Sequence, residues 1–253
     1  MTNDLTQDAF LGGMVQLLQP RKGYRAGVDP VLLAASVPAV AGQSVLDLGC
    51  GVGAAALCLG ARVPGLALTG VEIQADYAGL AERNGADRLE VILADLNDLP
   101  AGLRARQFDH VIANPPYFDR EAGHAGPDLG RETALAETTP LAVWIKVAAK
   151  RVKPKGLVHF IHRAERIPQI LRELPKYMGS IEILPISPRA GRLAELAIIR
   201  ARKNGRAAFR LYPPLILHEG ERHLKDADSY VTAVKEVLRD GKALDFSASL
   251  IQS

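Results

Sequence analysis

The sequence has few cysteines, few aromatic residues and no long apolar run. Its 253 residues include two cysteines, Cys50 and Cys58, both in apolar segments. Two cysteines are too few to cross-link a chain of this size, so we expect reduced thiols, as in a cytosolic protein, and no four-cysteine zinc site. The longest apolar candidate, residues 31–40, contains Pro38 and is shorter than the roughly 18 residues of a membrane span. The N-terminus lacks the basic and then apolar stretches of a secretory signal.

Charge is distributed unevenly along the chain. Residues 1–100 carry a net charge of −5 and residues 101–253 a net charge of +8. Within residues 145–210, 16 Lys and Arg stand against 4 Asp and Glu, a net charge of +12. Such a segment suits a polyanion such as RNA, although a solvated protein face has a similar composition. With 48% hydrophobic residues, the chain can form a packed core and is not intrinsically disordered.

Apolar runs alternate with helical patterns through the middle of the chain. Strands are expected at residues 44–48, 67–71, 89–93, 108–113 and 157–161, with helices at 53–60, 75–84 and 141–152. This alternation predicts an α/β fold, a parallel sheet with helices on both faces. Apolar segments at 181–184 and 193–200 flank a turn-rich stretch and predict a hairpin that ends the sheet with an antiparallel strand.

Three segments lie outside this pattern. In residues 1–43, Asp29 and Pro30 are typical of an N-cap and a first helical residue, and predict a helix over 31–36. Residues 118–136 are Gly-rich, charged and aperiodic, which is typical of a functional loop. Residues 203–253 form a C-terminal extension with one predicted helix at 229–238, for which Asp228 is the candidate cap.

A Gly-rich turn follows the first predicted strand. It reads Asp47-Leu48-Gly49-Cys50-Gly51-Val52-Gly53, and its glycines allow backbone amides to approach a ligand closely. The spacing G-x-G-x-G differs from the dinucleotide fingerprint G-x-G-x-x-G, and the preceding acid, Asp47, suits a cationic group better than a phosphate. S-adenosylmethionine carries an ammonium and a sulfonium and no phosphate, so the turn favours this cofactor over NAD.

Two further acids end the second and third strands. Glu72 is placed to accept both ribose hydroxyls, and Asp95 to accept the adenine amino group with Leu96 against the ring. Each acid alone is better explained by a structural role, such as helix entry or loop capping. Because the carboxyl ends of parallel strands meet at one edge, where such folds bind ligands, the three acids together favour a cofactor site.

The fourth strand leads into Asn114-Pro115-Pro116-Tyr117, here called the Asn-Pro-Pro-Tyr turn. Each proline fixes φ and removes a donor, so the Asn114 amide oxygen and the Pro115 carbonyl become fixed acceptors. Two neutral acceptors that bind the N–H groups of a planar nitrogen favour its tetrahedral form during methylation. The Tyr117 ring offers a stacking face, and the structural alternative is a β-turn with a buried tyrosine.

The Gly-rich turn and the Asn-Pro-Pro-Tyr turn together resemble the class I S-adenosylmethionine-dependent N-methyltransferases of adenine N6, guanine N2 and glutamine N5. Residues 10–13, 19–20 and 23–35 are similar to the opening of the bacterial tRNA(Val) adenine-N6 methyltransferase family. The resemblance covers most of residues 8–200. It implies a Rossmann-like, seven-stranded, mostly parallel sheet with an antiparallel hairpin strand, and a flipped anticodon-loop adenine as substrate.

The resemblance and the residue patterns together assign roles and boundaries. An N-terminal helical extension (1–43) would pack on the cofactor site of a methyltransferase core (44–202), followed by the C-terminal extension (203–253). The residues expected to bind S-adenosylmethionine are Arg25, Gly27, Asp29, Asp47, Gly49, Cys50, Gly51, Glu72, Ile73, Asp95, Leu96 and Asn114. The expected catalytic residues are Asn114, Pro115, Pro116 and Tyr117, and those expected to contact RNA are Lys153, Lys155, Arg189 and Arg192.

The expected partner is RNA, in first place tRNA, in the cytoplasm. No metal and no membrane are expected, because no histidine has metal-ligand spacing, and a homodimer is left open. Two other interpretations remain. The tetrapeptide does not separate an adenine amine from a glutamine amide, so a protein-glutamine N5 methyltransferase is an alternative that the +12 segment disfavours. A non-catalytic RNA-binding protein on the same scaffold is the other.

Overall fold

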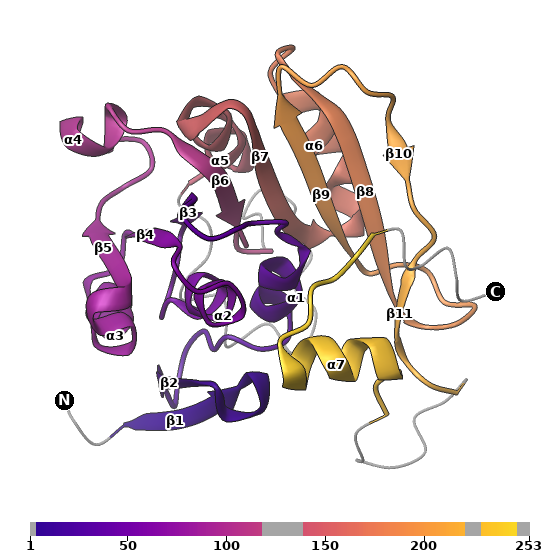
Figure 1. The fold of residues 1–253 in the computed structure, drawn as a ribbon, viewed down its shortest axis with the longest axis horizontal. Helices are drawn as coiled ribbons and strands as arrows, with labels where there is room; N and C mark the ends of the chain where they lie inside the picture. Colours follow the sequence, from indigo (N-terminus) through magenta and orange to yellow (C-terminus); the bar gives the residue numbers. More distant parts are fainter. Residues whose placement is uncertain (1–3, 118–138, 221–228, 247–253) are drawn as a thin grey trace.

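The computed structural model describes residues 4–117, 139–220 and 229–246 (Figure 1). Its centre is a nine-stranded sheet in the order β10-β8-β9-β7-β6-β3-β4-β5, and β11 also pairs with β8. The central strands are β3 (Ser44–Leu48), β4 (Ala67–Glu72), β5 (Leu89–Leu93), β6 (Phe108–Ala113), β7 (Val152–Arg163), β8 (Met178–Arg189) and β9 (Leu196–Lys203). β3 to β7 are parallel, and β9 runs antiparallel to both β7 and β8. The predicted α/β class and the antiparallel hairpin strand are therefore confirmed.

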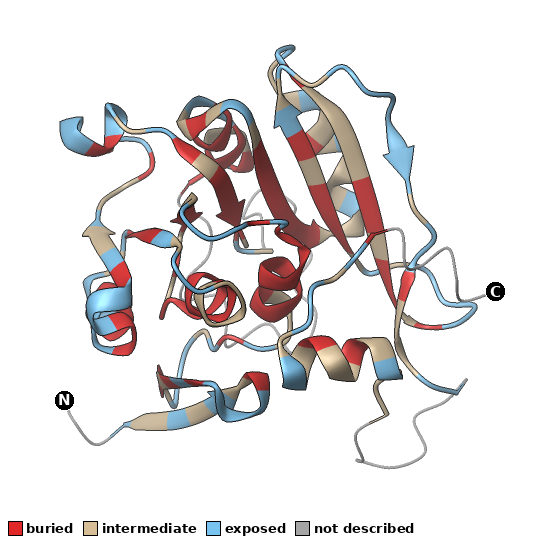
Figure 2. Cartoon of the chain, in the orientation of Figure 1, coloured by how far each residue is buried: buried red, intermediate tan, exposed pale blue. Residues whose placement is uncertain are grey.

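Helices cover both faces of this sheet. Alternate residues of a strand point to opposite faces, and in β3 Val45 belongs to one apolar core while Leu46 belongs to the other. The first core is closed by α1 (Asp29–Ser36), α2 (Ala54–Arg62), α3 (Ala75–Gly85) and α7 (Thr232–Asp240), and the second by α4 (Ala101–Arg104), α5 (Leu141–Arg151) and α6 (Ile167–Glu173). Both α1 and α2 are almost wholly buried (Figure 2). No helix in the described ranges has the length and apolar character needed to cross a membrane.

The C-terminal extension contributes more than the predicted helix. Two short strands, β10 (Arg210–Leu211) and β11 (Leu215–His218), pair in parallel with β8 and widen the sheet from seven strands to nine. The α7 helix begins at Thr232 with Val231 as its N-cap, so the predicted cap at Asp228 is wrong. Asp228 itself, like the 118–136 loop, lies outside the described residues.

The N-terminal extension opens with a β-hairpin instead of a helix. Its strands β1 (Leu5–Phe10) and β2 (Val15–Pro20) are antiparallel and joined by the 3-10 turn η1 (Leu11–Gly13). The predicted helix follows as α1, but its N-cap is Val28. Asp29 lies inside the first turn, and its carboxylate accepts a hydrogen bond from Tyr117. The predicted capping role of Asp29 is therefore wrong.

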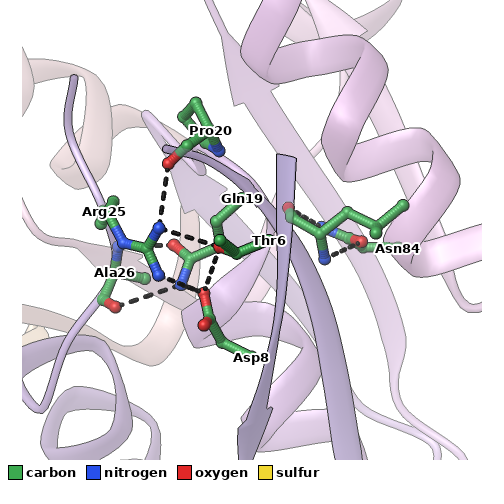
Figure 3. Close-up of polar contacts among 8 residues, drawn as sticks. Thr6, Asp8, Gln19, Pro20, Arg25, Ala26 and Asn84 are labelled. Carbon is green, nitrogen blue, oxygen red and sulfur yellow. Dashed lines mark hydrogen bonds and ion pairs between the residues drawn. The ribbon is translucent and has the colours of Figure 1, made fainter. Parts of the chain in front are cut away.

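The buried Gln19 and an ion pair nearer the surface fasten the hairpin to the chain that follows it (Figure 3). The Gln19 side chain accepts a hydrogen bond from the Ala26 amide at 2.8 Å and donates to the Ala26 carbonyl at 3.4 Å. It also donates to Asp8 at 2.8 Å. Asp8 forms a 2.6 Å ion pair with Arg25. These contacts fix the segment that leads into α1.

A second contact fastens the hairpin to the core. The Asn84 side chain of α3 accepts from the Leu18 amide at 2.8 Å and donates to the Leu18 carbonyl at 3.1 Å. It also donates to the Val52 carbonyl, in the Gly-rich turn, at 3.0 Å. One amide side chain therefore joins β2 to the turn that follows β3.

Replacing Gln19 with Met should lower the free energy of unfolding by about 1–3 kcal/mol, because the buried Ala26 amide loses its acceptor. Urea denaturation measures this difference. Gln16→Met is the matched control, since Gln16 lies on the same strand with its side chain exposed. Equal denaturation midpoints for the two variants would contradict a stabilising role of the hydrogen bonds between Gln19 and Ala26.

Candidate active site

The predicted site residues meet at the carboxyl edge of the parallel sheet. Asp47 lies near the end of β3, Glu72 ends β4, and Asp95 follows β5. Asn114 follows β6, which pairs with β3 on the side opposite β4. After β3 the chain adds β4 and β5 on one side and then β6 and β7 on the other side. Ligands of open α/β sheets bind at the point where the strand order switches in this way. The structure thus brings the three acids and the Asn-Pro-Pro-Tyr turn to one edge.

The Glu72 carboxylate organises the Gly-rich turn. One of its oxygens accepts from the Gly51 amide at 2.9 Å, and the other accepts from the Gln74 amide, at the start of α3, at 2.9 Å. Glu72 therefore has the structural role of a helix-entry acid, which the sequence analysis gives as the alternative to ribose binding. Each carboxylate oxygen can accept a second hydrogen bond, so this role leaves capacity for ligand hydroxyls.

The glycines of the turn are required for different reasons. Gly49 has φ +63°, and a Cβ there would lie 2.3 Å from the indole of Trp144 in α5. Packing of Trp144, as well as backbone conformation, therefore requires glycine at this position. At Gly51 the atom nearest to an added Cβ is a ring carbon of Tyr24 at 3.9 Å, and at Gly27 nothing lies within 4 Å. These two positions leave room beside the backbone.

Asp47 is a buried carboxyl group whose charge is poorly compensated. One oxygen accepts from the Ala56 amide of α2 at 3.3 Å. Burial raises the pKa of Asp47 to about 8, the Ala56 hydrogen bond opposes this, and the charge of Glu72 adds to it. Such a group either keeps its proton or takes a cationic partner.

The thiol of Cys50 is buried beside the same acids. Burial raises the pKa of Cys50 well above its ordinary value, and the charges of Asp47 and Glu72 raise it further. The backbone amide of Cys50 donates to the Val71 carbonyl at 2.9 Å. Cys50 therefore contributes to the turn through its backbone, with an unreactive side chain.

The remaining predicted cofactor residues differ in their surroundings. Ile73, next to Glu72, is 48% exposed, and Leu96 is buried. Asp95 accepts from the amide and the side chain of Asn97 at 2.8 and 3.0 Å, so it caps its loop. Arg25 is bound to Asp8 in the hairpin, and its described contacts support a structural role.

Tyr24 orients the Asn114 side chain, and the sequence pattern alone gave it no role. The Asn114 amide nitrogen donates to the Tyr24 hydroxyl at 3.4 Å, and the Tyr24 carbonyl accepts from Tyr77 of α3 at 3.1 Å. Among the described residues, neither the Asn114 amide oxygen nor the Pro115 carbonyl has a hydrogen-bond partner. The only sequence signal for Tyr24 was its place in the 23–35 segment.

Tyr117 joins the Asn-Pro-Pro-Tyr turn to the N-terminal extension. Its hydroxyl donates to Asp29 at 2.5 Å, and its ring centroid lies 5.3 Å from that of His162 and 6.0 Å from the Arg163 guanidinium. Burial raises the pKa of Tyr117 above its ordinary value, and the adjacent Asp29 raises it further. Burial also raises the pKa of Asp29, which the Tyr117 hydrogen bond and Arg163 oppose.

The four cations predicted to contact RNA do not form one surface. Lys153 and Lys155 lie in the bulged amino end of β7, roughly 20 Å along the strand from Arg163 at its carboxyl end. Lys153 is paired with Asp109 at 2.9 Å. Arg189 is buried, and its guanidinium donates to the Glu219 and Gly220 carbonyls.

Arg192 alone of the four is exposed at the carboxyl edge. It lies in the turn between β8 and β9, and the Glu195 carbonyl of this turn accepts from the Ala164 amide at 2.9 Å, directly after Arg163. The four cations therefore lie at two different edges of the sheet, because net charge along the sequence does not show at which end of a strand each cation lies. Their contact with RNA stays a prediction. Within the described ranges, no three His, Cys, Asp or Glu residues are grouped to hold a metal ion.

Comparisons with known proteins agree with this geometry. The family described as methyltransferase small domain matches residues 27–173. The tRNA1(Val) (adenine(37)-N6)-methyltransferase of Shewanella halifaxensis is 37% identical over 58% of this chain and 61% of its own length. The protein of the same name from Porphyromonas gingivalis strain W83 is 34% identical over 70% of this chain and 72% of its own length. The match to the Shewanella relative thus spans less than two thirds of that protein.

A solved structure resembles the whole fold. The crystal structure of a predicted O-methyltransferase from Agrobacterium tumefaciens has a TM-score of 0.68 and 27% sequence identity. The match covers 86% of this chain and 98% of that chain. The similarity therefore extends beyond the region that the family match covers.

Replacing Asp47 with Asn should change how stability depends on pH. Because the folded-state pKa lies near 8 and the ordinary value is 3.8, the folded chain holds this proton more tightly than the unfolded chain. Asp47 therefore makes the free energy of unfolding fall as pH rises from about 4 to 8. Urea denaturation at pH 5 and pH 8.5 measures the free energy of unfolding of Asp47→Asn and of wild type. Relative to wild type, the variant should be more stable at pH 8.5 than at pH 5. Parallel pH curves would contradict a buried protonated carboxyl.

Proposed function

The chain belongs to the methyltransferase small-domain family, together with tRNA1(Val) adenine-N6 methyltransferases, and we propose that it transfers a methyl group from S-adenosylmethionine to N6 of an adenine in tRNA. The observation that carries this proposal is the Asn-Pro-Pro-Tyr turn, which lies at the same sheet edge as Asp47 and Glu72. The relatives are named for adenine 37 of tRNA1(Val), which makes that adenine the substrate to test first.

The residues at the edge fit the cofactor. S-adenosylmethionine supplies an electrophilic methyl group on a cationic sulfur. The buried Asp47 carboxyl is the group whose negative charge a cationic ligand would stabilise. Glu72 would accept the ribose hydroxyls, and the exposed Ile73 with Leu96 would pack on the adenine. Gly27 and Gly51 leave the space that such a ligand needs.

The Asn-Pro-Pro-Tyr turn recognises an amino group through two acceptors. The Asn114 amide oxygen is the acceptor left over when the amide nitrogen bonds to Tyr24, and the Pro115 carbonyl is the second. Together they would bind the two N–H groups of a primary amine and stabilise the tetrahedral nitrogen that forms as its lone pair attacks. A hydroxyl substrate has a single hydrogen, so this pair favours a nitrogen over an oxygen nucleophile.

The cations at the carboxyl edge suit a nucleic-acid substrate better than a glutamine side chain. Arg163 lies beside the Tyr117 ring, and the turn that carries Arg192 and Leu193 is hydrogen-bonded to the residue after Arg163. These three residues are here called the edge rim. Leu193 is 90% exposed, next to Arg192 in the turn between β8 and β9. Two arginines can bind phosphates of a loop whose adenine stacks on Tyr117.

The wild-type chain should transfer tritium from labelled S-adenosylmethionine to tRNA from a strain lacking this gene, and nucleoside analysis should find N6-methyladenosine. Asn114→Ala should reduce transfer by about two to three decades, because one fixed polar group at the transition state is lost. Its cofactor affinity, measured by calorimetry, should stay close to that of wild type. Gln16→Ala, which removes an exposed amide side chain from the N-terminal hairpin, is the control. Label in protein instead of RNA would support the glutamine alternative.

The edge rim makes a separate prediction about RNA binding. The double variant Arg163→Gln/Arg192→Gln should weaken tRNA binding and flatten the slope of log affinity against log salt by about 1.4–1.8, since each lost phosphate contact contributes about 0.7–0.9. Lys153→Gln/Lys155→Gln removes the same charge from the opposite edge and should change the slope little. Filter binding at several salt concentrations measures both. A larger effect in the lysine variant would contradict the edge rim and favour the far edge of the sheet.

A further inference from the structure

Asp29 and Tyr117 form a hydrogen bond between α1 and the Asn-Pro-Pro-Tyr turn. The Tyr117 hydroxyl donates to the Asp29 carboxylate at 2.5 Å. Asp29 is expected from the sequence to bind the cofactor, but among the described residues its side chain bonds to Tyr117 alone. The structure therefore connects Asp29 to the residue that offers a stacking face to the substrate.

The position of Asp29 is fixed by the chain on both sides of it. After Asp29, α1 is buried from Pro30 to Ser36, and its leucines belong to the apolar core. Before Asp29, the Gln19 side chain bonds to both the amide and the carbonyl of Ala26. A carboxylate held in this way cannot follow a partner that moves, so Asp29 gives Tyr117 a fixed point of attachment.

The hydrogen bond restricts a part of the turn that the prolines leave free. The two pyrrolidine rings fix φ of Pro115 and Pro116, but the side-chain torsions of Tyr117 can adopt several rotamers. A bond at the hydroxyl, the tip of the side chain, fixes both torsions at once. The ring also contacts the His162 ring at a centroid distance of 5.3 Å. Because Tyr117 is only half-buried, part of its ring stays accessible in this fixed position.

The Tyr117 hydroxyl has a function that stacking does not require. Burial raises the pKa of Tyr117 above its ordinary value, and the adjacent Asp29 raises it further. The hydroxyl therefore keeps its proton near pH 7 and is the donor in this bond. Stacking of a base needs an aromatic ring alone, which phenylalanine also supplies. The hydroxyl matters because it attaches the ring to Asp29.

We propose that Asp29 is a positioning residue, which holds the Tyr117 ring in the orientation in which the target adenine stacks on it. This role rests on the proposed function. Asp29 acts on the nucleic-acid substrate through Tyr117, and its contribution belongs to the use of tRNA and not to the affinity for S-adenosylmethionine. A ring that is oriented before the base arrives lowers the entropic cost of binding.

Three substitutions test the two ends of the bond. Tyr117→Phe keeps the ring without the donor, Asp29→Leu removes the acceptor at similar size, and Asp29→Asn keeps an acceptor oxygen. We expect Tyr117→Phe and Asp29→Leu each to lower kcat/KM for tRNA about ten- to a hundredfold, as for a lost hydrogen bond to a charged group. Asp29→Asn should recover most of this loss. In all three, the affinity for S-adenosylmethionine, measured by calorimetry, should match that of wild type.

A second tyrosine provides the matched control. The Tyr212 hydroxyl donates to the Glu182 carboxylate of β8 at 2.9 Å, and β8 lies three strands away from β6 in the sheet. Tyr212→Phe thus removes a bond of the same kind away from the Asn-Pro-Pro-Tyr turn. It should lower the free energy of unfolding and leave kcat/KM unchanged.

The double variant Asp29→Leu/Tyr117→Phe separates positioning from a structural role in α1. If Asp29 acts through the hydroxyl, Asp29→Leu should add little to the loss in Tyr117→Phe, because the bond is already absent. Losses in kcat/KM that multiply, wild-type kcat/KM in Tyr117→Phe, or a lower cofactor affinity in Asp29→Asn would overturn the proposal.

The same set of variants gives a readout that does not depend on activity. Urea denaturation of wild type, both single variants and the double variant measures the coupling of Asp29 and Tyr117 in the free energy of unfolding. Absence of coupling would overturn the hydrogen bond and the proposal with it. If the wild-type chain methylates no RNA, the proposed function fails, and the unfolding measurements still decide whether Asp29 holds Tyr117.

Discussion

The hydrogen bond from Tyr117 to Asp29 joins the two parts of the chain that form the site. Tyr117 belongs to the turn after β6, and Asp29 to the first turn of α1. Because both groups are partly buried, neither can exchange its partner for water without cost. Gln19 fixes the segment that carries Tyr24 and Asp29 through the backbone of Ala26, and Asn84 fastens the hairpin to the core. The N-terminal extension therefore contributes Tyr24 and Asp29 to the proposed active site.

The groups at the carboxyl edge favour two different kinds of ligand. The Asp47 carboxyl favours a proton or a cation, whereas the Asn114 amide oxygen and the Pro115 carbonyl are neutral acceptors for N–H groups. A cationic methyl donor and a neutral amine match these two halves. The arginines of the edge rim add the positive charge that a polyanionic substrate needs. Two arginines of the basic half, Arg163 and Arg192, thus lie at the same edge as the acids of the acidic half.

Local patterns predicted the centre of the fold well. The bounds of β3, β5 and β6 agree with the predicted strands, because each is a short apolar run closed by turn residues. Long-range contacts explain the errors. Asp29 resembles an N-cap in sequence but bonds to Tyr117, and Lys153 contributes to a basic segment but lies at the far edge. The buried Gln19 interrupts the apolar alternation of β2, so the sequence pattern does not indicate the hairpin.

The central claim is that the Asn-Pro-Pro-Tyr turn binds the amino group of a target adenine. A crystal structure of the chain with S-adenosylhomocysteine and an anticodon stem-loop tests it most directly. The account predicts that adenine N6 lies within about 2.6–3.2 Å of both the Asn114 amide oxygen and the Pro115 carbonyl oxygen. It also predicts the base stacked on Tyr117. An adenine bound away from this turn, or an Asn114 whose amide nitrogen faces the base, would contradict it.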